Sequence, residues 1–490
     1  MERYEKKISY LLYMLTIITL LTMFFTSFNE YIWLDEAFSL KLIQHSYKEV
    51  VLLTARDVHP PLYYIILKFF VDLCNKFGGI DKIVGSMVSI IPYISLLVIS
   101  LTKIRKRWGI LTSSVFIFCV TLMPNCVFPG TEIRMYSFGM LFVTLAYIEA
   151  YEVIINRSWK YWIRFLIFGV CAAYTHYFAC IAVAFVYVYL LLWSILKERT
   201  EFKKWLLMSA GTVILYLPWL FVVLKQVSDV KSSYWIPPIT LDNMYGYIKF
   251  VLSPNKGILM ALLGISYGYL LFKLFLGKKN QEVKLYTITG LLVLCFTVLF
   301  GIVVSFLMRP IFVDRYIIPS LGCFWLCFAI CLGYLDKTKM NRMIQGGIIL
   351  VLLVVGFLNY KSFTTQELTE MKAANRVKDI LVEEDAEEDI IIADTIHVQF
   401  TLSNYLDNEV YIDGEDIGDL SKDVYGNVGT RRLEDAIFSG KPVLYFSTRD
   451  MEEVTRNLKN INPDVTIDYI EDINFASMDV SLYRIISKNY

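Results

Sequence analysis

The sequence predicts a polytopic α-helical membrane protein that carries a soluble α/β domain at its C-terminus. The composition is the first observation behind this prediction. Of the 490 residues, 56% are hydrophobic and 15% are aromatic, whereas only 19% are charged. Soluble domains have roughly 25% charged residues. Because so many apolar side chains do not fit inside one water-soluble core of this size, an integral membrane protein is expected.

The distribution of charge is the second observation. Residues 1–360 contain 34 Lys and Arg against 19 Asp and Glu, whereas residues 361–490 contain 13 against 27. We therefore expect a transmembrane domain over residues 1–360 and a soluble α/β domain over residues 361–490. The net charge of +1 leaves no basic surface for phosphates, which excludes a nucleic-acid partner.

Eleven apolar stretches between residues 8 and 359 are long enough to cross about 30 Å of hydrocarbon. With eleven spans, six basic clusters fall on one side, which the positive-inside rule assigns to the cytoplasm. The pattern thus predicts a multi-pass plasma-membrane protein with a cytoplasmic N-terminus and an extracytoplasmic C-terminal domain. The clusters are Arg3 to Lys7, Lys103 to Arg107, Arg157 to Arg164, Lys197 to Lys204, Lys278 to Lys284 and Lys337 to Arg342.

One apolar run tests this count of spans. Leu62–Leu73 contains Lys68 and Asp72 and is only twelve residues long. We expect a short interfacial helix over about residues 61–76. The alternative is a tilted true span, which would invert the orientation of everything downstream.

The acidic tail alternates strand-like and helix-like pieces, which indicates a small α/β sandwich. It contains no glycine-rich phosphate loop. Strands are expected at Asp389–Ala393, Glu409–Ile412, Pro442–Ser447, Val465–Tyr469 and Val480–Ile485, and helices at Ala373–Val382, His397–Leu406 and Met451–Leu458.

The first outer loop, residues 29–61, contains the residues with the clearest chemistry. Asp35 and Glu36 are adjacent carboxylates, and either could act as a general base. Adjacent helical positions point about 100° apart, so only one of the two faces a given site. The other could cap a helix or pair with Arg56. Asp57 and His59 follow just before Pro60-Pro61.

Three further clusters lie on the predicted outer side. They contain Glu132, Arg134 and Tyr136, then His176 and Tyr177, then Arg309, Arg315 and Tyr316. Arginines in short outer loops run against the positive-inside bias, and a guanidinium matches the oxygens of a phosphate. The alternatives are that Arg134 and Arg315 reach lipid headgroups and that His176 is only a packed histidine.

These motifs resemble the dolichyl-phosphate-mannose–protein mannosyltransferases, which form glycosyltransferase family 39 in the GT-C superfamily. The resemblance covers roughly residues 1–335. It rests on Asp35-Glu36 and on Arg56-Asp57-x-His59-Pro60-Pro61-Leu62-Tyr63-Tyr64. Glu132-x-Arg134-x-Tyr136 and Arg315-Tyr316-x-x-Pro319 are similar to motifs of bacterial members.

The resemblance implies an inverting enzyme that moves a hexose-type sugar from a polyprenyl-phosphate donor to an acceptor hydroxyl. The acceptor would be a glycan, lipid or protein at the outer membrane face. Asp35 maps onto the catalytic carboxylate, with Glu36 beside it. Arg134, Arg315 and Arg56 are expected to bind the donor phosphate. Asp57, His59, Glu132, Tyr136, His176 and Tyr316 are expected to complete the pocket.

No cofactor is expected. Asp35, Glu36, Asp57, His59 and Glu132 could supply ligands to a divalent cation, so a cation stays an open alternative, although no ligand spacing favours one and no metal ligand is assigned. A different class of function is a transporter or flippase for lipid-linked sugars. Transporters often show inverted repeats and ionisable residues at mid-depth, and the sequence shows neither. A membrane-anchored sensor that works through its tail is a third alternative.

Overall fold

The structure is a computed structural model that describes residues 2–232, 236–252, 257–277, 281–336, 338–386 and 388–487. Lys278, Lys279 and Lys337 of the basic clusters lie outside these residues. The chain divides into two compact units. The membrane unit comprises Met1–Phe25, Val58–Tyr63 and Ser86–Phe363. The loop–sheet unit comprises Thr26–Asp57, Tyr64–Gly85 and Thr364–Tyr490.

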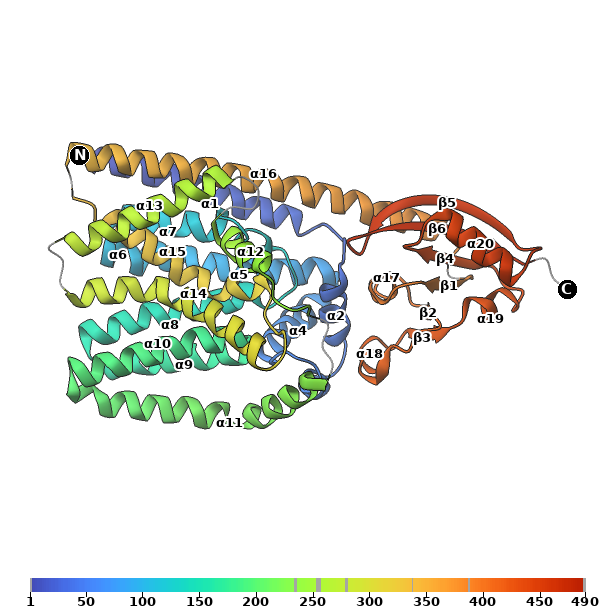
Figure 1. The fold of residues 1–490 in the computed structure, drawn as a ribbon, viewed down its shortest axis with the longest axis horizontal. Coiled ribbons are helices and arrows are strands. Elements are labelled where there is room, and N and C mark those ends of the chain that lie inside the picture. The colour runs from blue at the N-terminus through green and yellow to red at the C-terminus, as the bar shows by residue number, and fades with distance from the viewer. Residues whose placement is uncertain are drawn as a thin grey trace. The chain divides into compact units, whose positions relative to one another are not determined.

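The membrane unit is a bundle of helices, and each of the eleven predicted stretches coincides with one of them (Figure 1). Nine helices in the described ranges are long and apolar enough to cross a membrane. Two others are shorter, α7 with 13 residues and α9 with 17. The predicted class of polytopic helical membrane protein with a small C-terminal sheet domain is confirmed.

The helices of the chain up to the sheet are α1 (Glu2–Thr26), α2 (Leu34–Leu42), α3 (Tyr47–Thr54), α4 (Leu62–Asn75), α5 (Asp81–Ile99), the π-helix η1 (Ser100–Ile104), α6 (Arg105–Trp108), α7 (Ile110–Leu122), η2 (Phe128–Gly130), α8 (Tyr136–Asn156), α9 (Trp159–Thr175), α10 (Tyr177–Leu196), η3 (Arg199–Glu201), α11 (Phe202–Ser232), α12 (Leu241–Leu252), α13 (Gly257–Leu276), α14 (Gln281–Leu307), η4 (Asp314–Ile317), α15 (Ile318–Gly333) and α16 (Lys339–Glu383).

Helices α7, α8 and α15 form the buried centre of the bundle, and small residues let them approach closely. A Cβ atom on Gly322 of α15 would lie 1.8 Å from the Thr144 hydroxyl of α8. A Cβ atom on Gly290 of α14 would lie 2.5 Å from the Cys323 carbonyl oxygen of α15. These contacts fix the helices against which the candidate site is built.

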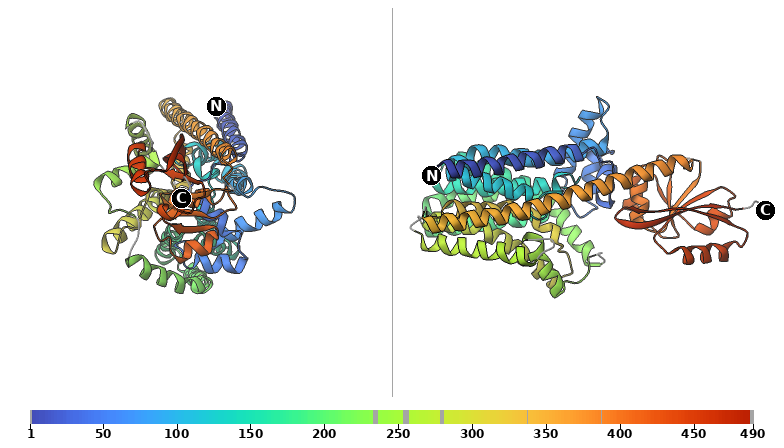
Figure 2. Two further views of the ribbon diagram at one scale, coloured as in Figure 1. Left: turned by 90° about the vertical axis from the view of Figure 1, so that its right-hand side faces the viewer. Right: turned by 90° about the horizontal axis from the view of Figure 1, so that it is seen from above.

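Helix α16 is longer than expected. It runs without a break for 45 residues, so the last predicted span and the predicted amphipathic helix Ala373–Val382 form one element. Helix α1 lies beside its first part in both views (Figures 1 and 2), where the hydroxyls of Thr22 and Tyr360 are 2.9 Å apart.

Helix α4 corresponds to the predicted interfacial helix. Its 14 residues rise about 21 Å, which is short of the hydrocarbon thickness. Lys68 pairs with Asp72 at 3.1 Å and donates to the Ile43 carbonyl at 2.9 Å, so its charge is neutralised within the loop–sheet unit.

The sheet contains six strands in the order β3-β2-β1-β4-β6-β5. β1 pairs in parallel with β2 and β4, with Ile391 opposite both Val410 and Leu444, whereas β6 is antiparallel to β4 and β5. Of these elements, β3, α18 and α19 were not expected from the sequence. The elements are β1 (Ile390–Ala393), α17 (Ile396–Leu402), β2 (Val410–Asp413), α18 (Gly418–Tyr425), β3 (Val428–Arg431), α19 (Leu433–Ile437), β4 (Val443–Ser447), α20 (Met451–Ile461), β5 (Thr466–Phe475) and β6 (Met478–Ile486).

Each face of the sheet is covered by helices. The end of α16 and α17 pack on one face, and α19 and α20 pack on the other. The buried strands read as short continuous apolar runs, as expected for parallel strands covered on both sides. The predicted α/β sandwich is therefore present.

The first outer loop belongs to the same compact unit as the sheet. The sequence placed this loop with the transmembrane domain, but residues 26–57 group with residues 364–490. Towards the C-terminus, the membrane unit ends at Phe363 and the loop–sheet unit resumes at Thr364.

Candidate active site

Four residues of the membrane unit form what we call the arginine–histidine cluster: His59, Arg134, His176 and Arg315. Arg134 lies in the irregular segment between η2 and α8, and His59 precedes the Pro60-Pro61 pair that leads into α4. The Arg134 Nη2 atom donates to His59 Nε2 at 2.9 Å. Both side chains are buried, with Arg134 only 3% exposed. Arg134 therefore does not extend outward to headgroups.

His176 is the single extended residue between α9 and α10, with φ −159° and ψ 139°. Its Nδ1 atom accepts a hydrogen bond from the Phe178 backbone N–H at 3.2 Å and so caps α10. Its ring packs against Tyr136 at 5.5 Å and Tyr316 at 5.0 Å between centroids. The His176 ring is thus packed among aromatic rings, and its centroid lies 5.9 Å from that of the His59 ring.

The electrostatics of the cluster are strongly positive. Burial, together with the charges of Arg134 and Arg315, lowers the pKa of His176 to about 3. Burial also lowers the pKa of His59 well below its usual value, with Arg134, His176 and Arg315 adding to the effect. Both imidazoles are therefore neutral at physiological pH, and the hydrogen bonds above leave the proton on His59 Nδ1 and on His176 Nε2.

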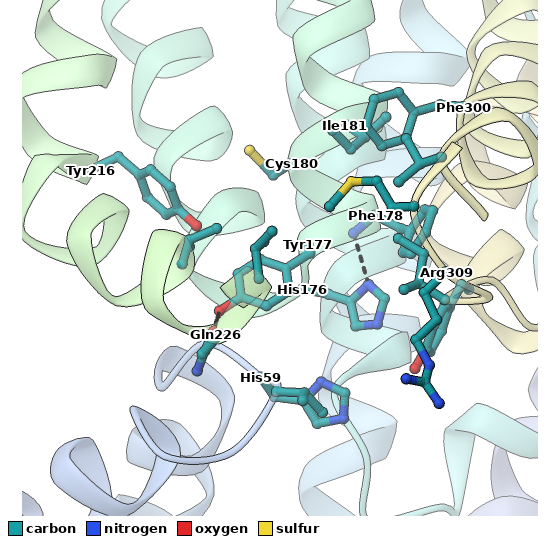
Figure 3. Close-up of a pocket in the computed structure, with 17 residues that line it drawn as sticks. His59, His176, Tyr177, Phe178, Cys180, Ile181, Tyr216, Gln226, Phe300 and Arg309 are labelled. Carbon is teal, nitrogen blue, oxygen red and sulfur yellow. Dashed lines mark hydrogen bonds between the residues drawn. The ribbon is translucent and has the colours of Figure 1, made fainter. Parts of the chain in front are cut away.

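A cavity of about 400 Å³ opens next to this cluster. His59, His176, Arg309 and Tyr316 line its polar end, and Figure 3 shows the imidazoles of His59 and His176 and the guanidinium of Arg309 on the same side. Apart from Tyr177, Tyr216 and Gln226, the other walls are apolar and come from α10, α11, α14 and the segment that follows α14. They include Phe178, Cys180, Ile181, Val223, Val227, Phe300, Val304, Met308 and Ile311. This volume is in the range of small-molecule sites.

Arg309 and Gln226 line the cavity but were not assigned to the site from the sequence. Arg309 was visible as an arginine in an outer loop, which is a signal that could have found it. Gln226 lies inside the apolar helix α11 and hydrogen-bonds the Tyr177 hydroxyl (Figure 3). No spacing in the sequence points to it.

The remaining predicted residues of the membrane unit take supporting positions. Glu132 is half-buried, and its backbone carbonyl accepts from the Ser89 hydroxyl at 2.6 Å and from the Arg134 backbone N–H at 2.8 Å. This geometry shapes the turn that presents Arg134. Arg315 is the second residue of η4, and its backbone N–H donates to the Asp314 carboxylate at 2.8 Å.

Asp35 and Glu36 lie in the loop–sheet unit, in the first turn of α2. The helix is capped by Trp33 without a side-chain hydrogen bond, so neither carboxylate is the N-cap. The positive end of the helix dipole favours both charges. Glu36 is buried and pairs with Lys82 of α5 at 3.4 Å, whereas Asp35 is half-buried. The alternative in which Glu36 pairs with Arg56 is therefore wrong.

Arg56 pairs instead with Asp423 of α18 at 2.6 Å, and both side chains are about half exposed. Asp57 is half-buried at the end of α3, where its backbone N–H donates to the Leu53 carbonyl. Within the described ranges, no three His, Cys, Asp or Glu side chains are arranged to hold a metal ion.

Two structures with this architecture are of ArnT from Cupriavidus metallidurans. The apo form matches with a TM-score of 0.61 at 10% identity, and the form bound to undecaprenyl phosphate matches with 0.60 at 11% identity. Each match covers 96% of this chain and 97% of that chain. The chain has the GT-C fold. This confirms the architecture that the motifs implied.

A third structure, the archaeal oligosaccharyltransferase AglB from Archaeoglobus fulgidus in complex with an inhibitory peptide and a dolichol-phosphate, matches with a TM-score of 0.45 at 10% identity. It covers 71% of this chain and 55% of that chain. No protein-family model and no curated protein matches the sequence.

Proposed function

We propose that the protein is a glycosyltransferase that takes a sugar from a polyprenyl-phosphate donor and transfers it to an acceptor hydroxyl. One observation carries the proposal, namely that His59 and His176 of the arginine–histidine cluster line an apolar cavity together with Arg309, with Arg134 bonded to His59. A polyprenyl phosphate has the same division, because an anionic group is joined to a long hydrocarbon chain. The ArnT structure with undecaprenyl phosphate supports a ligand of this class.

The cluster suits the chemistry of the leaving group. When the bond between the anomeric carbon and the phosphate oxygen breaks, negative charge grows on the departing phosphate. Arg134 supplies a fixed guanidinium that is already desolvated, and Arg309 and Arg315 add positive charge. The proton on His176 Nε2 makes the imidazole a neutral donor. Neither histidine needs to change its protonation state for this role.

The acceptor hydroxyl must lose its proton as it attacks, and its pKa lies far above 7. The family resemblance assigns this step to Asp35, with Glu36 beside it. A single displacement inverts the configuration at the anomeric carbon. A nearby carboxylate stabilises the positive charge that develops on the anomeric carbon in the transition state. Arg56 and Asp57 stay predictions for the same site.

We further propose, from the sequence resemblance, a hexose-type and mannosyltransferase-like specificity with a glycan, lipid or protein as the acceptor. The charge pattern supports a plasma-membrane location with the N-terminus in the cytoplasm and the sheet on the outer side. It follows that transfer takes place at the outer face.

The test is transfer by the purified protein in detergent. We expect label to leave at least one member of a panel of radiolabelled polyprenyl-phosphate hexoses, which includes mannose and glucose, when acceptor lipids or glycans from the membrane are added. An enzyme makes product without a sealed membrane, whereas a flippase does not. Arg134→Ala should abolish most of this loss of label.

The matched control is Arg164→Ala. Arg164 is an arginine of α9 whose guanidinium packs on the Tyr161 ring of the same helix. The control should transfer at the wild-type rate. Loss of label that is equal in the wild type, in Arg134→Ala and in boiled protein would show that the cluster does not bind a sugar donor.

A further inference from the structure

The first outer loop and the sheet domain form one compact unit, which raises the question of what the sheet domain does for the loop. The segment from Asn29 to Leu42 contains α2 and both predicted carboxylates. It is held by side chains and backbone groups from three separate loops of the sheet domain. These loops follow α17, precede β3 and connect β5 to β6.

Tyr405, which follows α17, holds the backbone just before α2. Its hydroxyl donates to the Glu30 carbonyl at 2.8 Å and accepts from the Ile32 N–H at 3.1 Å. One phenol therefore satisfies two backbone groups on either side of Tyr31. Burial raises the pKa of Tyr405, so the phenol keeps the proton that this geometry needs.

Tyr31 itself makes the second contact. It is only 4% exposed, and its hydroxyl accepts from the Ser477 backbone N–H at 2.8 Å. Ser477 lies in the turn between β5 and β6 at a φ of 62°. Thus a tyrosine of the sheet domain, Tyr405, bonds the loop backbone, and a tyrosine of the loop, Tyr31, bonds the backbone of the sheet domain.

The third contact fixes the far end of α2. The Lys41 Nζ atom donates to the Asn427 side-chain oxygen at 3.0 Å. The amide nitrogen of Asn427 donates in turn to the carbonyls of Ser403 and Leu406, at 3.0 and 2.9 Å. The side chain of Asn427 is therefore positioned by hydrogen bonds within the sheet domain, independently of its bond to Lys41. Both ends of α2 are therefore bonded to the sheet domain.

We infer that the sheet domain is the scaffold that sets the position of α2, with Tyr405 and Asn427 as positioning residues for the carboxylates on that helix. The inference rests on the proposed function in one respect, namely that Asp35 takes part in transfer. An error of about 1 Å in such a group can cost about 100-fold in rate. Anchoring at both ends of a nine-residue helix is a means of avoiding that error.

The experiment compares full-length Tyr405→Phe with the wild type by hydrogen–deuterium exchange and by transfer kinetics. The substitution removes one oxygen and keeps the ring, which packs on Phe475 at 5.8 Å. We expect the amides of residues 30–42 to exchange about 5- to 30-fold faster, because both hydrogen bonds between the phenol and the loop backbone are lost. We expect kcat to fall about tenfold and the KM for the donor to stay within about twofold.

Two further variants make the test specific. Lys41→Met keeps the apolar stem of the side chain and removes the contact with Asn427, so it should give the same two changes. Tyr411→Phe removes a phenol that bonds Glu409 within the sheet domain, so it should change neither. A variant that fails to fold would be recognised by faster exchange over the whole of residues 364–487, and Lys41→Met then decides.

Unchanged exchange in residues 30–42 of both Tyr405→Phe and Lys41→Met would overturn the inference that the sheet domain positions α2. Faster exchange with an unchanged kcat would overturn the positioning role. If the wild-type protein transfers no sugar from any donor, the proposed function fails and the positioning role fails with it. The exchange measurement still decides whether the sheet domain holds the loop.

Discussion

Replacing Arg134 by alanine is the change that tests the cluster most directly. The guanidinium is 3% exposed and lies 2.9 Å from a neutral imidazole, so it is a desolvated charge that does not need to reorganise. At an effective dielectric constant of about 20, two unit charges about 4 Å apart interact by about 4 kcal/mol. A hydrogen bond to a charged group has a net worth of about 1.5–3 kcal/mol.

These two bounds place the loss of transition-state stabilisation between about 2 and 4 kcal/mol. Since 1.4 kcal/mol is a factor of ten, kcat/KM for the donor should fall by about 30- to 700-fold. Arg134→Lys should recover only part of this loss, because a lysine lacks the planar fork that matches phosphate oxygens. The assay is the initial rate of label transfer from a polyprenyl-phosphate sugar at subsaturating donor concentration.

Replacing Arg134 by alanine should also change how activity depends on pH. Arg134 is one of the charges that lower the pKa of His59 and His176, so its removal should bring both values closer to 6.5. Residual activity in Arg134→Ala should then vary with pH between 5 and 7 more than the wild-type activity does. The reasoning is refuted if Arg134→Ala keeps its thermal midpoint and a kcat/KM within threefold of the wild type.

Three other predictions concern the charges and the cavity. Because the pKa of His176 is lowered to about 3, the unfolded state binds more protons than the folded state between pH 3 and 6.5, so stability is lost as pH falls through this window. At pH 5 the free energy of unfolding should be about 2 kcal/mol lower than at neutral pH. His176→Asn keeps a hydrogen-bond acceptor for the cap of α10, so its thermal midpoint should fall less than that of the wild type between pH 7.5 and 5. Asp35→Asn should abolish transfer and leave the thermal midpoint unchanged. Glu36→Gln should destabilise the fold by about 3–5 kcal/mol, because Lys82 loses its buried carboxylate partner. Equal effects of the two substitutions on transfer and on stability would contradict these separate roles. Ile181→Trp should fill part of the cavity and raise the KM of a long-chain donor about tenfold, with little change for a donor of one or two isoprene units; an equal rise for both donors would place the lipid elsewhere.

The helical fold could be predicted from the sequence because a membrane imposes a long apolar run on every span. The strands β1 and β4 could be predicted for a related reason, since both are covered on two faces and read as apolar runs. β3 was missed because its four residues, Val428–Arg431, include a glycine and have two outward-facing side chains. The continuity of α16 was missed because its polar second half reads as a separate amphipathic element.

The candidate site was predicted in part. Arg134 and His176 were found because charged and imidazole groups are rare in outer loops of apolar proteins. Their mutual arrangement with His59 comes from packing between segments about 40 to 120 residues apart, which no local pattern encodes. The pairing of Glu36 with Lys82 was missed for the same reason, and so was that of Arg56 with Asp423, which lies 367 residues further along the chain.

The neutral state of the two buried imidazoles has a consequence for where such a catalyst can work. The charge that a lipid phosphate meets is set by guanidinium groups, which keep their protons in any natural medium. A cell buffers its interior but not its surroundings, whose acidity can change by orders of magnitude within hours. A binding site without a group that titrates near neutrality would hold its ligand equally well through such swings, with no regulatory protein to adjust it.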